Sequence, residues 1–266
     1  QAPLPAGTLM PRLLFISDLH LSPTHPDILA SFLGFLRSDA GKADALYILG
    51  DLFDSWVGDD DDTELARQVR GALAALSEHI PVHFQAGNRD FLIGARFCEQ
   101  TGVSLMADET VIEIKGKRIL LMHGDLLCSD DLDYQQARKT LRNPAFISDF
   151  LSKPLAERQQ LAAHYRKLSG EATAAKAANI MDVNQQTLVS FMHKHRADWL
   201  IHGHTHRPGD HGFELEGRPC KRRVLAPWSD DSAQVLQLDY SDDKPGMLIS
   251  RYEAGTRNSS GAASYC

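Results

Sequence analysis

Five short polar clusters carry the side chains in this chain that could do chemistry. They are Asp18-Leu19-His20, Gly50-Asp51, Gly87-Asn88-Arg89-Asp90, His123-Gly124-Asp125 and Gly203-His204-Thr205-His206. Imidazole nitrogens and carboxylate or amide oxygens are common ligands of divalent first-row metal ions. Residues two apart on an extended backbone point to the same side, so Asp18 and His20 can reach one ion. The residue types and their spacing therefore predict a metal site.

Each cluster directly follows a short apolar run, and such runs predict buried strands. The runs cover residues 13–16, 45–49, 82–84, 119–122 and 199–201. Amphipathic helices are predicted over 28–36 and 64–76, a hairpin over 110–122, and later strands over 224–225, 233–238 and 247–252. Alternating strands and helices indicate an α/β fold with a largely buried sheet. Ligands of α/β sheets bind beyond the carboxyl ends of the strands, so the five clusters should converge there.

The stretch 134–195 differs from the rest because it contains no strand-like run. It predicts several helices, broken near Pro144, Pro154 and Gly170, and we interpret it as an insertion that caps the site. Between residues 137 and 176 it holds eight basic and three acidic residues, with apolar residues interleaved. Basic helices with an apolar face suit an anionic membrane surface or an amphiphilic anionic substrate. The pattern fits a solvated helical hairpin equally well, so it leaves both alternatives open.

Composition narrows the class of protein. Hydrophobic residues make up 43% and charged residues 24% of 266 residues, as in an ordinary globular protein. No apolar run approaches the roughly 20 residues of a membrane span, and residues 1–12 lack the features of a secretory signal, so we expect a cytoplasmic protein. The net charge of -7 argues against nucleic acid as a partner. We expect the acidic run 59–62 to be a solvated loop, and residues 1–10 and 254–266 to be flexible ends.

The ordered pattern D-x-H, G-D, G-N-x-D, H-G and G-H-x-H resembles the calcineurin-like metallophosphoesterase family. The resemblance implies a four-layer α/β/β/α sandwich over residues 11–253, with the helical cap as an insertion. It also implies a two-metal centre in which Asp51 bridges the ions. One ion would be held by Asp18, His20, Asp51 and His206, and the other by Asp51, Asn88, His123 and His204. Two such ions activate a water molecule and stabilise the phosphoryl charge.

Arg89 stands where the wider family usually has histidine, which is often assigned as a general acid or a phosphate ligand. Arginine is a poor acid, but its planar fork suits phosphate oxygens. An enzyme without that acid should favour a leaving group that needs no proton, such as the phosphate monoester released from a pyrophosphate. Arg89 therefore favours pyrophosphate cleavage over alkyl-ester cleavage. The alternative is that Arg89 only forms a salt bridge with Asp90.

Longer segments around the clusters resemble the UDP-2,3-diacylglucosamine hydrolase family of lipid A biosynthesis. The similarity runs from about Leu13 to Tyr252 and is carried by residues 46–53, 87–94, 122–128, 180–184 and 199–208. It implies two Mn²⁺ ions and hydrolysis of the pyrophosphate at the α-phosphorus, which gives 2,3-diacylglucosamine 1-phosphate (lipid X) and UMP. It also implies that the cap accommodates the acyl chains, and that the protein is peripheral on the cytoplasmic face of the bacterial inner membrane.

The same resemblance implies a set of substrate contacts, with Asp51, Asn88 and Arg89 as catalytic residues. The contacts are Asn88, Arg89, Asp131, Tyr134, Ser169, Thr173, Lys176 and His204. Family members commonly carry asparagine where this chain has Thr173, which lacks the amide, so the contact there should differ. The segment Ala226-Pro227-Trp228-Ser229 also departs from the family's usual G-x-W-H. Neither departure changes a predicted metal ligand.

Three other functions fit parts of the sequence. An enzyme of the same fold could act on another nucleotide diphosphate or phosphodiester, and acyl chains on the substrate would then bring little benefit. A nuclease is disfavoured by the acidic net charge and by the lack of a long basic stripe. A scaffold without catalysis would tend to lose metal ligands, whereas all seven predicted ligands are present.

Overall fold

The computed structural model describes residues 11–174, 182–240, 247–254 and 264–265, and for 168–174, 247–248 and 264–265 it describes the backbone alone. The first sheet has the order β12-β11-β10-β1-β2-β3-β4. Its strands are β1 (Arg12–Ile16), β2 (Ala45–Leu49), β3 (Val82–Gln85), β4 (Ser104–Met106), β10 (Gln234–Tyr240), β11 (Met247–Glu253) and β12 (Ser264–Tyr265). Strands β1 to β4 are parallel, whereas β10 to β12 run antiparallel to their neighbours.

The second sheet faces the first and has the order β5-β6-β7-β9-β8. Its strands are β5 (Thr110–Ile114), β6 (Lys117–Met122), β7 (Trp199–His202), β8 (Gly209–Leu215) and β9 (Arg218–Val224). Strands β6, β7 and β9 are parallel, and β5 and β8 form antiparallel hairpins with β6 and β9. Parallel strands present their carboxyl ends to one edge, so each sheet brings several polar clusters together.

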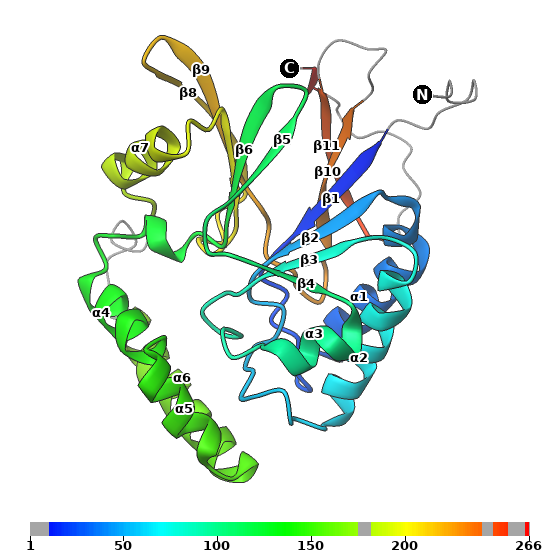
Figure 1. Cartoon of the computed structure of the whole chain (residues 1–266), viewed down its shortest axis with the longest axis vertical. Coiled ribbons are helices and arrows are strands. Elements are labelled where there is room, and N and C mark those ends of the chain that lie inside the picture. Colours follow the sequence, from blue (N-terminus) through cyan, green and yellow to red (C-terminus); the bar gives the residue numbers. More distant parts are fainter. Residues whose placement is uncertain (1–10, 175–181, 241–246, 255–263, 266) are drawn as a thin grey trace.

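Helices cover the outer face of each sheet (Figure 1). The helices are α1 (Pro26–Ser38), α2 (Glu64–Ser77), α3 (Ala95–Thr101), α4 (Leu132–Leu141), α5 (Pro144–Ser152), α6 (Leu155–Ala174) and α7 (Gln185–Lys194), with short 3-10 turns at Ala40–Lys42 and Asp125–Leu127. Helices α1 to α3 lie against the first sheet and α7 against the second. The predicted four-layer α/β/β/α arrangement is confirmed.

Strand β1 shows how the sequence builds these layers. Leu14 and Ile16 belong to the core beneath α1 and α2, whereas Leu13 and Phe15 belong to the core between the two sheets. This alternation follows from the two-residue period of a strand. A third core lies between the second sheet and α7, where Leu188 and Met192 are buried. Because β1 is apolar on both faces, it can lie inside the sandwich rather than at its surface.

The five predicted strands and both predicted helices are present, together with the predicted hairpin. Sequence analysis missed β4, β8 and α3, and the strand expected at 224–225 is the end of the longer β9. Helix breaks occur at Pro144 and Pro154, but α6 continues through Gly170. A single glycine costs a helix only about 1 kcal/mol, so the surrounding helix formers prevail there.

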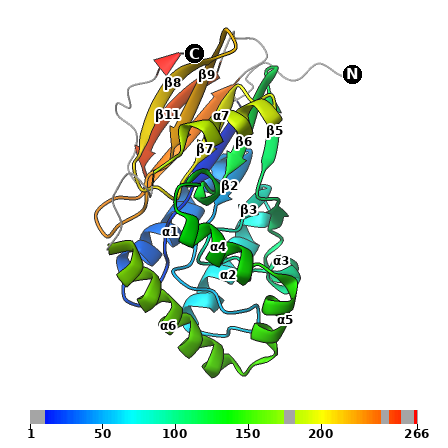
Figure 2. The same ribbon diagram turned by 90° about the vertical axis from the view of Figure 1, so that its left-hand side faces the viewer.

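The helical stretch predicted over 134–195 has two parts in the fold. Helices α4 to α6 form an arm that extends from the site end of the sheets (Figure 2), whereas α7 packs on β6 and β7. The domain limits remain a prediction, and residues 1–10 and 255–263 of the expected flexible ends lie outside the described residues. Ser264–Tyr265, within the second of those ends, pair with β11.

The acidic run 59–62 is not simply a solvated loop, which corrects the sequence-based expectation. Asp59 accepts hydrogen bonds from the backbone N–H groups of Gly94 (3.1 Å) and Phe97 (3.0 Å), at the start of α3. Asp60 forms an ion pair with Arg158 of α6. Asp61 is buried, whereas Asp60 and Asp62 have 48% and 74% of their side chains exposed. The run therefore caps one helix and anchors another.

Within the described part of the chain, no helix combines the length and the apolarity that crossing a lipid bilayer requires.

Candidate metal centre

The five polar clusters follow β1, β2, β3, β6 and β7, and the structure brings them to one end of the sandwich. Strands β1, β2 and β3 are neighbours in the first sheet, and β6 and β7 are neighbours in the second. Backbone hydrogen bonds join the segments that leave the strands, for example from Asp18 N–H to the Gly50 carbonyl (3.0 Å) and from Gly203 N–H to the His123 carbonyl (2.8 Å). The candidate site is therefore framed by backbone as well as by side chains.

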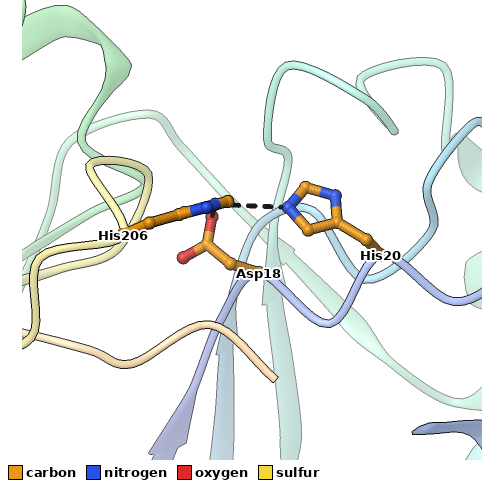
Figure 3. Close-up of side chains that lie close together, drawn as sticks. All are labelled: Asp18, His20 and His206. Atoms are coloured by element: carbon orange, nitrogen blue, oxygen red, sulfur yellow. Dashed lines mark hydrogen bonds and ion pairs between the residues drawn. The ribbon is translucent and has the colours of Figure 1, made fainter. Parts of the chain in front are cut away.

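The first group of donor atoms consists of Asp18, His20 and His206 (Figure 3). The Nε2 atoms of His20 and His206 lie 3.3 Å apart, and His206 Nε2 lies 3.5 Å from Asp18 Oδ1. These three residues come from the segment after β1 and the segment after β7, which are distant in the sequence. One donor atom from each lies within 4.8 Å of the other two, as a shared metal ion requires.

The second group consists of Asn88, His123 and His204. Asn88 Oδ1 lies 3.0 Å from His123 Nε2 and 3.0 Å from His204 Nδ1, and the two imidazole nitrogens are 3.2 Å apart. The Nδ1 atom of His123 lies 2.9 Å from the Leu49 carbonyl oxygen, so Nδ1 carries the proton that it donates. In the neutral imidazole, Nε2 is then the nitrogen with the lone pair for a metal ion, as is usual for histidine ligands.

Asp51 lies between the two groups. Its Oδ2 atom is 3.9 Å from His20 Nε2 and 3.8 Å from His123 Nε2. Atoms bound to one ion at roughly 2.1 Å lie at most about 4.2 Å apart. The separations from His206 to His20 and Asp18, those among Asn88, His123 and His204, and those from Asp51 Oδ2 to His20 and His123 are shorter than that limit. The donor atoms present therefore fit two metal ions, with Asp51 in reach of both.

The backbone at the site is unusual. Asp18, His20, Asp51, His204 and His206 have φ of 56°, 50°, 54°, 64° and 53°, in the left-handed region. Residues other than glycine seldom adopt this conformation, and those that do gather at functional sites. Gly203 permits the close approach of the two loops, because a Cβ atom there would overlap the carboxylate of Asp18 and lie 2.8 Å from Ser17 Cβ.

Electrostatics at the site leave two imidazoles uncharged. Burial lowers the pKa of His20 to about 4, although the charge of Asp18 acts in the other direction. Burial also lowers the pKa of His204 to about 4, and the neighbouring His123 contributes. Neutral imidazoles can offer a lone pair to a metal ion at neutral pH.

The pKa values of two other buried groups, Asp51 and His123, are raised rather than lowered. Burial raises the pKa of Asp51 to about 6, and the negative charge of Asp18 contributes. Burial opposes protonation of His123, but the charges of Asp51 and Asp18 outweigh it and raise the pKa of His123 to about 9. Carboxylates packed this closely disfavour each other's ionisation, and a bound cation would relieve that repulsion.

Arg89 has the environment of an anion ligand. Its backbone N–H donates to Asp51 Oδ1 (2.9 Å), while its side-chain Nε is buried without a hydrogen-bond partner among the described residues. No ion pair between Arg89 and Asp90 occurs in the described part of the chain. The carboxylate of Asp90 instead accepts backbone N–H groups, from Leu52 at 2.7 Å and Gly87 at 2.8 Å. This geometry argues against the salt-bridge alternative for Arg89.

The structure describes two of the predicted substrate contacts on the arm. Asp131 caps α4 by accepting the N–H of Tyr134 (3.0 Å), so at least part of its carboxylate has a structural role. The Tyr134 hydroxyl donates to Asp125 Oδ2 (2.7 Å), and its ring centre lies 5.8 Å from that of His204. The side chains of Ser169 and Thr173 and all of Lys176 lie outside the described residues.

Sequence analysis missed an ionic network that joins α4 to the site. Arg138 Nε donates to Asp125 Oδ2 (2.6 Å), and Arg138 Nη2 donates to Asp108 Oδ2 (2.6 Å). Arg142 Nη1 donates to the other oxygen of Asp108 (3.1 Å). The spacing of the two arginines, one helical turn apart, places both on one face of α4. Their acidic partners lie in other parts of the sequence, so spacing alone could not identify them.

The segment with the unusual Ala226-Pro227-Trp228-Ser229 sequence lies beside the first group of donor atoms. The backbone N–H of Trp228 donates to the Asp18 carbonyl (3.1 Å), and the indole Nε1 donates to the Gln234 carbonyl (3.1 Å). The indole ring also packs edge-on against Phe35, with ring centres 5.8 Å apart. Trp228 therefore supports the backbone of Asp18 from the helix side of the first sheet.

Comparison with known proteins assigns the class. Residues 11–208 match the family described as calcineurin-like phosphoesterase, and the chain belongs to this family of hydrolases. Divalent metal binding is a property of this fold, and it agrees with the donor atoms of Asp18, His20 and His206 and of Asp18, Asp51 and His123, which lie within 4.8 Å of one another in each set.

Individual proteins of known name also match most of the chain. The chain is 49% identical over 223 residues to UDP-2,3-diacylglucosamine hydrolase of Escherichia fergusonii, which covers 84% of this chain and 93% of that protein. The figures are the same for UDP-2,3-diacylglucosamine hydrolase of Escherichia coli O7:K1. The predicted resemblance to this family is therefore confirmed. Among solved structures, a dimetal phosphatase from Danio rerio shares the fold, with a TM-score of 0.54, 13% identity and coverage of 97% of this chain and 99% of that one.

Proposed function

We propose that this chain hydrolyses the pyrophosphate bond of UDP-2,3-diacylglucosamine and releases 2,3-diacylglucosamine 1-phosphate and UMP. The observation that carries the proposal is the position of Asp51 between two groups of donor atoms, with the N–H of Arg89 bonded to its other carboxylate oxygen at 2.9 Å. Arg89, the proposed phosphate ligand, is thus bonded through its backbone to Asp51, the proposed bridging ligand. The substrate class is proposed from the names of the two relatives, because the match covers 93% of the length of each.

Seven side chains would hold the metal ions. Asp18, His20, Asp51 and His206 would hold one, and Asp51, Asn88, His123 and His204 the other. We propose Mn²⁺ for both, on the resemblance to the family, because these ligand types also suit other divalent first-row ions. When bound, such ions lower the pKa of a water molecule and offset the charge of the reacting phosphoryl group.

The protein's own residues orient the substrate. The guanidinium of Arg89 offers a planar fork to the oxygens of the pyrophosphate, and its buried Nε needs an acceptor. The backbone N–H of Arg89 holds one oxygen of Asp51, which leaves Oδ2 directed between His20 and His123. Arg89 gives up no proton, so it does not serve as a general acid. The leaving phosphate monoester needs none, and this is the physical reason to prefer a pyrophosphate.

The helical arm would carry the contact with lipid. Large apolar side chains on α4 to α6 are exposed, including 75% of Leu132, 40% of Leu151 and 42% of Tyr165. Arg138, Arg142 and Arg158 of the same arm are ion-paired with other parts of the protein, so the exposed Lys139 and Lys167 would be the ones to face anionic headgroups or the anionic substrate. We propose that the protein binds peripherally to the cytoplasmic face of the inner membrane. The measurement is co-sedimentation with vesicles: binding to anionic vesicles that weakens with salt is expected, and equal binding to neutral vesicles would contradict it.

The central experiment combines the protein, Mn²⁺ and UDP-2,3-diacylglucosamine, and identifies the products by mass. We expect UMP and 2,3-diacylglucosamine 1-phosphate. In heavy-oxygen water the label should appear in UMP, because the attack is at the α-phosphorus. Label in the sugar phosphate instead would overturn that site of attack.

The alternative functions give different results in the same assay. A UDP-sugar without acyl chains should be a much poorer substrate, whereas an enzyme for other nucleotide diphosphates or phosphodiesters would cleave it equally well. A nuclease would bind DNA at moderate salt and cut it, and we expect no such binding.

A further inference from the structure

Arg142 connects the helical arm to the loop that carries Asn88 and Arg89. It follows the last residue of α4, and its Nη2 donates to the Gly87 carbonyl (2.8 Å) and more weakly to the Ala86 carbonyl (3.4 Å). Only 18% of its side chain is exposed. A cation of the arm thus bonds to the backbone directly before the predicted catalytic residues.

Two further contacts fix the orientation of this guanidinium. Its Nη1 donates to Asp108 Oδ1 (3.1 Å), and its Cζ lies 5.5 Å from the ring centre of Phe91. Phe91 belongs to the same loop, so Arg142 touches the loop both before and after Arg89. A planar guanidinium with several donors can bridge such partners, whereas an ammonium group cannot match the geometry.

Residues outside the arm also hold the loop. The carboxylate of Asp90 accepts N–H groups from Gly87 and Leu52, and Asp51 accepts the N–H of Arg89. The backbone N–H of Trp56 also donates to the Arg89 carbonyl (3.1 Å), so bonds within the main domain already restrain residues 87–90. Arg142 is the described contact that restrains it from the arm.

Asp108 links the Arg142 contact to the loop that carries His123. Arg138 bonds to the other oxygen of Asp108 (2.6 Å) and also to Asp125 (2.6 Å), which lies two residues after His123. Helix α4 therefore contacts the loop of Asn88 through Arg142 and the loop of His123 through Arg138. The side chains of Asn88 and His123 lie 3.0 Å apart, so a displacement of either loop would change their geometry.

We infer that Arg142 is a positioning residue, which holds the loop 86–91 so that Arg89 faces the phosphate while the arm is in place. The inference rests on the proposed function for its activity readout, but its structural readout is independent of the substrate. It assigns to the arm a role beyond contact with acyl chains. A loop held both by the main domain and by the arm loses less conformational freedom when substrate binds.

The test compares Arg142→Met, Arg142→Lys and, as a matched control, Arg37→Met on the exposed face of α1. Hydrogen exchange of the metal-loaded protein is measured on a peptide spanning residues 86–92. Arg142→Met should speed exchange there, Arg142→Lys should do so less, and Arg37→Met should leave it unchanged. Metal stoichiometry should stay at the wild-type value in all three. Unchanged exchange in Arg142→Met would overturn the inference.

A double-mutant cycle with Arg89 separates positioning from general stability. Arg142→Met should lower kcat/KM at least about 10-fold in the wild-type background but less than about 2-fold when Arg89 is already alanine, because the two residues act through one loop. Equal losses in both backgrounds would overturn the inference. If the wild-type protein failed to cleave UDP-2,3-diacylglucosamine, the proposed function would fail, while hydrogen exchange would still decide the role of Arg142.

Discussion

Arg158 of α6 and Asp60 of the loop before α2 form an ion pair that ties the outer part of the helical arm to the helix layer of the first sheet. Arg158 Nη1 donates to Asp60 Oδ1 (2.8 Å) and to the Val57 carbonyl (2.6 Å), and Nε donates to the Lys153 carbonyl (2.9 Å). Its side chain is only 3% exposed. The arm is therefore fastened both beside the site, through Arg142, and away from it.

Replacing Arg158 with alanine should loosen the outer part of the arm. The change leaves the Val57 carbonyl without that donor and empties a buried position, so we expect a loss of about 1–3 kcal/mol in the free energy of unfolding. The expected loss is modest because 48% of the Asp60 side chain is exposed. Urea denaturation measures it. Arg67→Ala, whose side chain is 53% exposed, is the control and should cost below about 0.5 kcal/mol. Equal costs would contradict the assigned role.

Asp51→Asn tests the position between the two donor groups. The amide keeps an oxygen but removes the charge that both ions would share, so metal stoichiometry should fall. Mutation of residues that merely support a ligand costs 10–100-fold, so activity should fall by more than about 100-fold here. Metal analysis of dialysed protein and initial rates are the measurements. Full occupancy with normal turnover would refute the bridging role.

Gly203→Ala tests the close approach of the loops after β1 and β7. The new Cβ would overlap the carboxylate of Asp18, so we expect reduced metal content and activity together with lower stability. The control is Gly71→Ala in α2, where an added Cβ meets nothing within 4 Å. That control should raise stability by roughly 0.4–1 kcal/mol, because alanine restricts the unfolded chain. Similar effects of the two substitutions would show that the approach at Gly203 is unimportant.

Glu109 supplies a prediction about pH. Its Oε2 atom accepts from Lys194 Nζ (2.6 Å) and His195 Nε2 (2.5 Å) at the end of α7. Burial opposes ionisation of Glu109, but the hydrogen bonds from His195 and Lys194 outweigh it, so the pKa of Glu109 is lowered. A lowered pKa stabilises the fold above the ordinary value of about 4.3, and the contribution is lost as the pH falls through the lowered value.

The measurement compares wild type with Glu109→Gln in urea at fixed metal concentration. The variant should be less stable than wild type at pH 7, and the difference should shrink as the pH falls below about 4. A difference that stayed constant or grew toward acid would show that the carboxylate of Glu109 does not carry this effect.

The core strands could be predicted because their apolar runs are buried on both faces. Strand β2, with all five residues buried, has the predicted limits. Strand β8 was missed because its residues Gly209 to Glu214 are exposed or only partly buried, and its partner β9 supplies the pairing. Helix α3 was missed because its start depends on Asp59, whose carboxylate reaches it from another segment. The local sequence pattern therefore predicts strands and helices whose own residues are buried. It fails for an element whose formation depends on a residue far away in the sequence.

Some residues of the candidate site could likewise be predicted from local sequence, whereas others could not. Asp18 and His20, and likewise His204 and His206, stand two residues apart, so spacing placed each pair on one side of the chain. The order of all five clusters after predicted strands then indicated a common site. The convergence of Asn88 with His123 and His204 depends on the packing of β3 against the second sheet, where Gln85 donates to the Leu121 carbonyl (3.2 Å). Arg138 and Arg142 could not be predicted, because Asp108 and the Gly87 carbonyl have no sequence signature as their partners.

Five predicted metal ligands, Asp18, His20, Asp51, His204 and His206, occupy left-handed backbone. Each such residue costs about 1 kcal/mol, and this cost falls on folding rather than on the arrival of an ion. The backbone at the strand ends therefore sets the directions of these side chains before an ion binds. Ion binding should then change side-chain rotamers and leave the loop conformations unchanged. Exchange of one divalent ion for another should then alter reactivity while the backbone stays the same.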